Sequence, residues 1–90
     1  MTSPGSEPEP PNFDGMSHDE LWEFWKEHQR GWGVKKLPGF SRKITASFAA
    51  YACNKAVAMK CRQEGDITAA SIYERICEDI YGRLPKEARW

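Results

Sequence analysis

The chain has 90 residues, with 13 basic and 13 acidic side chains and a formal net charge of zero. A chain of this length forms one domain with a thin core, because it buries only about 60 per cent of the surface it exposes when unfolded. No run of the sequence approaches the roughly 20 apolar residues that a membrane-spanning helix needs. We therefore expect a single cytoplasmic domain without a membrane segment.

The first part of the chain is rich in proline and glutamate. Residues 1–12 contain four of the six prolines and two glutamates, with no aliphatic or aromatic residue after Met1. Such a segment buries too little apolar surface to offset the entropy that it loses on ordering. It also lacks the basic start and apolar centre of a secretory signal. We predict a disordered leader over residues 1–14 and a single helical domain over residues 15–90.

The first helix is predicted over residues 18–30. Ser17 and Glu20 have the spacing of a capping box, in which each side chain accepts a hydrogen bond from the other residue's backbone amide. Side chains suited to packing then recur at helical spacing and define one stripe: Leu21, Phe24, Trp25 and His28. Trp22 lies at the edge of that stripe.

Two more helices are predicted, over residues 41–64 and 67–83, after a linker at residues 31–40 with a turn signal at its end. The middle of the second helix is apolar nearly all round, which is typical of a helix packed on two sides, so we expect it in the centre. The third helix places its apolar residues on one stripe: Ile67, Ala70, Tyr73, Ile76, Cys77, Ile80 and Leu84. The pattern predicts an all-α fold, a small three-helix antiparallel bundle.

The three cysteines show no metal-binding or disulfide pattern. An odd number of cysteines without a CxxC pair is typical of a reducing cytosol. Cys53 and Cys61 are eight residues apart on one predicted helix, about 12 Å along its axis. Zinc–sulfur bonds are about 2.3 Å long, so these two thiolates cannot share an ion. We predict no metal site and no cofactor, and we expect the cysteines to act as small apolar side chains.

No pairing of a nucleophile with a base is indicated. Ser17 is expected to cap the first helix, and the adjacent His18 does not face it. Glu74, Glu78 and Asp79 are expected on the polar face of the third helix rather than as a catalytic carboxylate pair. The sequence therefore predicts a protein that is not an enzyme.

Positive charge is concentrated in the middle of the sequence. Residues 28–63 carry eight basic side chains and no acidic one, whereas residues 1–27 carry seven acids and one base. The basic loop at residues 30–43 interleaves its cations with Trp32 and Phe40, side chains that can stack on bases while the cations neutralise phosphates. A zero net charge is atypical of a nucleic-acid-binding domain. A solvated loop balanced by acids elsewhere is the equally weighted alternative.

Four tryptophans are many for a thin core. Trp25 fits the predicted core, whereas Trp22, Trp32 and Trp90 are candidates for exposed indoles of the kind enriched in interface hot spots. The alternative, equally weighted, is that Trp32 and Trp90 fold over the ends of the bundle and extend its core. The predicted partner-binding residues are Trp22, Arg30, Trp32, Lys35, Lys36, Phe40, Arg42, Lys43 and Trp90.

Residues 48–90 contain a series of short motifs: Tyr73-Glu74-Arg75, Ile80-Tyr81, Leu84-Pro85 and Arg89-Trp90. This series resembles small uncharacterised proteins of tailed bacteriophages. The resemblance implies a protein made in the cytosol of an infected bacterium, where it binds a host protein and changes its activity. It implies no catalytic residue.

The turn at Glu64-Gly65-Asp66-Ile67, with Ala70, Tyr73 and Cys77 after it, resembles one hairpin of a tetratricopeptide repeat. Gly82 stands where that repeat has its proline, and the sequence has no second copy. A lone unit does not build the concave peptide groove of such repeats.

Two hypotheses on function follow. The first is a non-enzymatic interaction protein that binds and modulates or inhibits a host protein, with self-association through the same surfaces as a further possibility. The second is a nucleic-acid-binding accessory protein that uses the basic loop.

Overall fold

The computed structural model describes residues 9–30 and 37–90, and all regular structure in these two ranges is helical. Each of the three predicted helices is present, with ends within one residue of the prediction, so the all-α fold is confirmed. The elements in chain order are the 3-10 turn η2 (Phe13–Gly15), α1 (His18–Arg30), α2 (Arg42–Gln63), α3 (Ile67–Arg83) and the 3-10 turn η3 (Lys86–Ala88).

Local side-chain chemistry fixes the start of α1. The Glu20 backbone amide donates to the Ser17 hydroxyl at 3.2 Å, and the Ser17 amide donates to Glu20 Oε1 at 3.2 Å. This reciprocal pair is the predicted capping box, and it satisfies two backbone donors that a helix start otherwise leaves without a partner.

A tight turn leads into α2. The Phe40 amide donates to the Leu37 carbonyl at 3.1 Å, and Gly39 has a φ of 82°. A positive φ at the third position of a turn is typical of type II, which favours glycine there. Ser41 then caps α2, because its hydroxyl accepts from the Ile44 amide at 3.2 Å. The predicted turn signal is confirmed.

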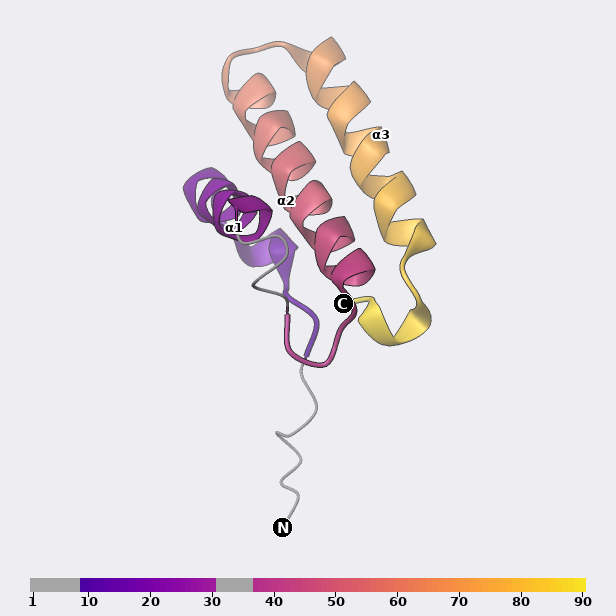
Figure 1. Cartoon of the computed structure of the whole chain (residues 1–90). Helices are drawn as coiled ribbons and strands as arrows, with labels where there is room; N and C mark the ends of the chain where they lie inside the picture. The colour runs from indigo at the N-terminus through magenta and orange to yellow at the C-terminus, as the bar shows by residue number, and fades with distance from the viewer. Residues whose placement is uncertain (1–8, 31–36) are drawn as a thin grey trace.

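Glycine also ends α2. Gly65 has a φ of 83°, the Asp66 amide donates to the Cys61 carbonyl at 2.9 Å, and the Gly65 amide donates to the Arg62 carbonyl at 3.1 Å. This pair of bonds is the Schellman motif, which satisfies the last carbonyls of a helix. Asp66 then caps α3 by accepting from the Ala69 amide at 3.1 Å. The short turn makes α2 and α3 an antiparallel hairpin, seen side by side in Figure 1.

An ion pair between Arg62 of α2 and Glu74 of α3 also links the two helices of the hairpin. The Arg62 guanidinium donates two hydrogen bonds to the Glu74 carboxylate, one of them at 2.6 Å. Both side chains are exposed, so solvent screens their attraction. These hydrogen bonds hold the pKa of the Glu74 carboxyl below its usual range.

The second helix lies in the centre of the fold, as predicted. It packs against α1 on one side and against α3 on the other, whereas α1 and α3 have at most marginal contact in the described part of the chain. Figure 1 shows α3 running along α2, with α1 on the opposite side of α2 and steeply inclined to it. The apolar surface nearly all round α2 is therefore used on two sides.

The core is centred on Phe13, which is fully buried. Its ring lies 5.0 Å from the Phe24 ring, 5.8 Å from Phe48 and 5.4 Å from Tyr51, measured between centroids. The predicted leader over residues 1–14 therefore extends too far, because residues 13 and 14 belong to the fold. The proline-rich composition of the segment gave no sign that Phe13 would be buried. Burying this ring stabilises the fold by about 2 kcal/mol or more.

Trp90 closes the same aromatic cluster. Its ring lies edge-on to Phe13 at 5.1 Å, to Tyr51 at 4.7 Å and to Tyr81 at 4.6 Å. The indole Nε1–H donates to Asp14 Oδ2 at 3.3 Å, and the Tyr81 hydroxyl donates to the Trp90 carbonyl at 2.6 Å. Edge-to-face aromatic pairs each add about 0.5 to 1.5 kcal/mol beyond the area they bury. The indole is half-buried and covers one side of the core.

The three cysteines are free thiols in different surroundings. Cys77 is buried and donates weakly from Sγ to the Tyr51 carbonyl at 3.7 Å, whereas Cys53 and Cys61 are half-buried. Burial raises the pKa of the Cys77 thiol to about 11, and burial also raises the pKa of Cys53. Cys77 is therefore the small apolar core side chain expected for all three cysteines.

Truncating the central ring tests the core directly. We expect Phe13→Ala to lower the free energy of unfolding by about 3 to 5 kcal/mol, the usual cost of removing a buried aromatic ring. Gln29→Ala, a change at an exposed position of α1, is the control and should alter it by less than about 0.5 kcal/mol. Urea unfolding followed by circular dichroism measures both. An equal, small effect of the two changes would contradict this description of the core.

Thiol labelling tests the environment of the cysteines. With a pKa of about 11, the Cys77 thiol is only about 0.1 per cent ionised at pH 8, and the thiolate is the reactive form. We expect iodoacetamide to label Cys77 at least about 100-fold more slowly than Cys61 in the folded protein, and at a similar rate in urea. Peptide mass spectrometry resolves the sites. Fast labelling of Cys77 without denaturant would show that it is not buried.

Candidate functional site

Four of the predicted partner-binding side chains lie outside the described residues, so their positions are not part of the site. They are Arg30, whose backbone ends α1, and Trp32, Lys35 and Lys36 in the linker. The remaining five are described by the structure, and they do not gather on one surface.

The three aromatic members of the predicted set that the structure describes pack against other side chains of the chain. Phe40 is only 9 per cent exposed and lies edge-on to Phe48 at 5.5 Å, because the type II turn folds its ring back onto the core. It therefore presents no face on which a base could stack. Trp22 is half-buried, with its ring 4.9 Å from that of Trp25. Trp90 is likewise half-buried against the core, so none of these three described aromatic side chains is fully exposed.

Arg42 and Lys43 are the predicted residues that remain exposed. They border a shallow groove of about 530 Å³ between α2 and the end of α3. We call it the basic groove, and it is lined by Arg42, Lys43, Ala46, Ser47, Ala50, Ile80 and Arg83.

The basic groove combines an apolar floor with a positively charged rim. Ala46 and Ala50 lie one turn apart on α2, so their small side chains leave a depression beside Ile80 of α3. Three cations and no carboxylate line it. Arg83 contacts Asp79 just outside the groove at 3.0 Å. Within the described ranges, neither Arg42 nor Lys43 has an ion-pair partner.

The position of these two cations in the helix is unfavourable for the isolated fold. Arg42 and Lys43 occupy the first turn of α2, which contains no acidic residue. The N-terminus of a helix carries a partial positive charge, so a cation there costs about 0.3 to 1 kcal/mol. An anionic group at this place would be attracted both by the helix end and by the two side chains.

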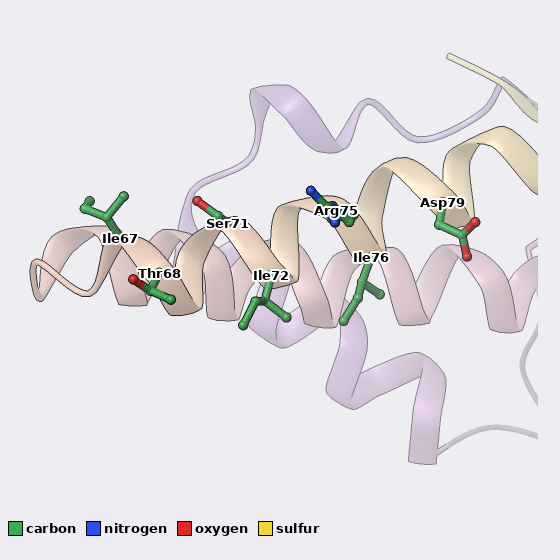
Figure 2. Close-up of a pocket in the computed structure, with 7 residues that line it drawn as sticks. All are labelled: Ile67, Thr68, Ser71, Ile72, Arg75, Ile76 and Asp79. Atoms are coloured by element: carbon green, nitrogen blue, oxygen red, sulfur yellow. The ribbon is translucent and has the colours of Figure 1, made fainter.

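A second surface lies on the outer side of α3. Ile67, Ile72 and Ile76 are 52, 57 and 38 per cent exposed. They line a shallow hollow of about 770 Å³ whose seven residues all come from α3. Figure 2 shows Ile72 and Ile76 projecting from one edge of the helix, with Ser71 and Arg75 directed to the other side. A hollow formed by one helix is an open surface rather than an enclosed cavity for a small molecule.

This surface is not evident from the sequence pattern. The predicted core stripe of the third helix includes Ile67 and Ile76, but the structure exposes both, so that assignment is wrong for these two residues. The side of α3 that faces α2 is centred on Ala70, Cys77 and the following Leu84, which are buried. Ile72 is five residues before Cys77, about 140° away round a helix. An angle of this size from the buried stripe indicates that Ile72 lies outside it, and this angle can be read from the sequence spacing alone.

A third depression, of about 410 Å³, lies on the face that carries Trp90 and includes Asp14, Glu74 and Glu78. Its polar groups contact one another: the Tyr51 hydroxyl donates to Asp14 Oδ1 at 3.4 Å, and Lys55 Nζ lies 3.6 Å from the same oxygen. Burial, with the nearby Asp14 carboxylate, raises the pKa of Tyr51. The Tyr51 hydroxyl and the Cys77 thiol, whose pKa burial also raises, are therefore held in their neutral forms, unlike an activated nucleophile.

The described residues, 9–30 and 37–90, contain no group of three or more metal-ligating side chains placed to hold an ion. None of their helices has both the length and the apolar character required to cross a membrane.

Comparison with known proteins adds no relative. The chain matches no family model, and the comparisons with curated proteins and with solved structures give no match either. The case for a function therefore rests on the chemistry of the surfaces described above.

Proposed function

We propose that this protein is a non-enzymatic interaction module that binds an acidic, amphipathic segment of a partner protein in the basic groove. The observation that carries the proposal is the combination of an apolar floor with three rim cations, of which Arg42 and Lys43 have no ion-pair partner among the described residues. The resemblance to phage proteins suggests a host protein of an infected bacterium as that partner.

The proposed partner segment follows from the chemistry of the groove. Acidic side chains of the segment would face Arg42, Lys43 and Arg83, while its apolar side chains would cover Ala46 and Ala50. Binding of an amphipathic helix in a shallow apolar groove is a recurring mode of peptide recognition. Anionic residues near the start of α2 would also offset the unfavourable placement of its two first-turn cations.

A nucleic acid fits the described surface less well. A phosphate backbone needs cations, but it gains little from a floor of alanine and isoleucine side chains. Stacking on exposed rings would be needed for single strands, and Phe40 is buried. The alternative is retained as an outcome of the experiment that follows.

Reversing the rim charges tests the proposal. We expect a tagged wild-type chain to retain a stoichiometric protein from bacterial lysate after nuclease treatment, and the variant R42E/K43E to bind that protein at least tenfold more weakly, because its rim then repels acidic side chains. The control K60E/K86E makes the same change in net charge at two exposed sites outside the groove and should bind like wild type. Calorimetry with the purified partner gives the affinities.

Two results would contradict the proposal. Equal loss of binding in the groove variant and in the control would show that only net charge matters. Retention that disappears on nuclease treatment and falls steeply with salt would instead assign the cations to a nucleic acid.

A further inference from the structure

The outer side of α3 carries isoleucine side chains that the described part of the fold does not bury. Ile72 is 57 per cent exposed and Ile76 is 38 per cent exposed, while Ile80, one more turn along, is half-buried and packs against the core. These three residues are spaced four apart, so they form a continuous ridge along α3. We call Ile72, Ile76 and Ile80 the isoleucine ridge.

No described segment of the same chain covers Ile72 and Ile76, whereas Ile80 is half-buried beside α2. The first helix packs on the far side of α2, and Figure 1 shows α3 at the edge of the molecule. Helices pack by inserting ridges of residues spaced four apart into the grooves of a neighbouring helix. A second helix is therefore the natural occupant.

The side chains beside the ridge include one positive and one negative charge, which could pair with the opposite charges on a second copy of α3. Arg75 and Asp79 are one turn apart on the outer side of α3, and both line the same hollow. Within the described residues Arg75 has no ion-pair partner, and Asp79 contacts Arg83 at 3.0 Å. A carboxylate has about four acceptor positions, so Asp79 can accept from a second guanidinium as well.

We propose that α3 pairs with α3 of a second copy of this chain, antiparallel, about a twofold axis near Ile76. In this register Ile76 faces its counterpart, and Ile72 of each copy faces Ile80 of the other. Residue 75 then faces residue 77 of the second copy, so Asp79 of that copy is offset by two residues, about 3 Å along the axis. The long side chain of Arg75 can span that offset to reach Asp79 of the second copy. Because the dimer has twofold symmetry, this ion pair occurs twice.

The self-complementary pattern decides in favour of a second copy over a different protein. A twofold interface uses the same patch on both partners, so each feature must match its own rotated image. The ridge matches isoleucine with isoleucine, and Arg75 is matched with Asp79. The ridge shares Ile80 with the basic groove, whereas Ile72, Ile76 and Arg75 lie outside it. Variants at Ile72 and Arg75 therefore test this pairing without altering the groove of the proposed function. The contact is a single helix pair, and we therefore expect a weak dimer in the micromolar range, on the order of 10 to 100 μM.

Analytical ultracentrifugation of the full chain between about 1 and 500 μM tests the pairing. We expect the weight-average mass of the wild type to rise from one chain towards two. I72E places a carboxylate on the ridge and should leave a monomer throughout. I67E is the matched control, because Ile67 is 52 per cent exposed but lies off the ridge, and it should dimerise like wild type. Circular dichroism confirms that each variant keeps its helices.

A charge swap tests the register. R75E and D79R should each weaken dimerisation at least tenfold, because each change sets like charges opposite one another. The double variant R75E/D79R restores opposite charges and should return to within about threefold of the wild type. R42E/K43E should leave the dimer unchanged, which separates this pairing from the basic groove.

Three outcomes would overturn the proposal. A wild-type chain that stays monomeric at about 500 μM excludes the dimer. A dimer insensitive to I72E places the interface elsewhere. A double variant no stronger than its two single variants excludes the antiparallel register.

Discussion

Packing around the Phe13 ring joins α1, α2 and the C-terminal residue of this small fold. The ring contacts Phe24 of α1, Phe48 and Tyr51 of α2, and Trp90 after the last helical turn. Each of these elements buries too little surface to be stable alone, because short helices in water gain most of their stability from tertiary contacts. The aromatic cluster supplies that contact on one side of α2. The hydrogen bond from Trp90 to Asp14 then ties residues 76 apart in the sequence.

The position of this cluster also determines which surfaces remain open. The rings occupy the region between α1 and α2 and the end of the hairpin, whereas α3 contributes a narrower buried stripe that includes Ala70 and Cys77. The outer half of α3 is therefore left in contact with water, with Ile72 and Ile76 on it. The small side chains of Ala46 and Ala50 in α2 leave the basic groove beside Ile80 of α3. Both surfaces lie on the hairpin, away from the rings that stabilise the fold.

The helices could be predicted from local chemistry, and the pairing of distant residues could not. The Ser17–Glu20 capping box, the φ-positive Gly65 and the Asp66 cap act within a few residues, so their spacing in the sequence is enough to place the helix ends. The contact of Phe13 with Trp90 spans almost the whole chain.

The same limit applies to the surfaces. Arg42 and Lys43 were predicted to be exposed binding residues from local charge, and they are exposed; their function in binding stays a prediction. Their association with Arg83 depends on the antiparallel hairpin, so it was not predictable. The isoleucines were missed because a third helix with apolar residues over much of its surface does not reveal which side α2 covers.

Trp90 packs within the chain, and we propose that the exposed isoleucines of α3 pack against a second copy. Nuclear magnetic resonance of isoleucine methyl groups and indole N–H groups, recorded as the protein concentration is raised, tests both halves in one measurement. We expect the Ile72 and Ile76 methyl signals to shift with concentration while the Trp90 indole signal stays fixed. A moving Trp90 signal with unchanged isoleucine methyls would contradict the claim.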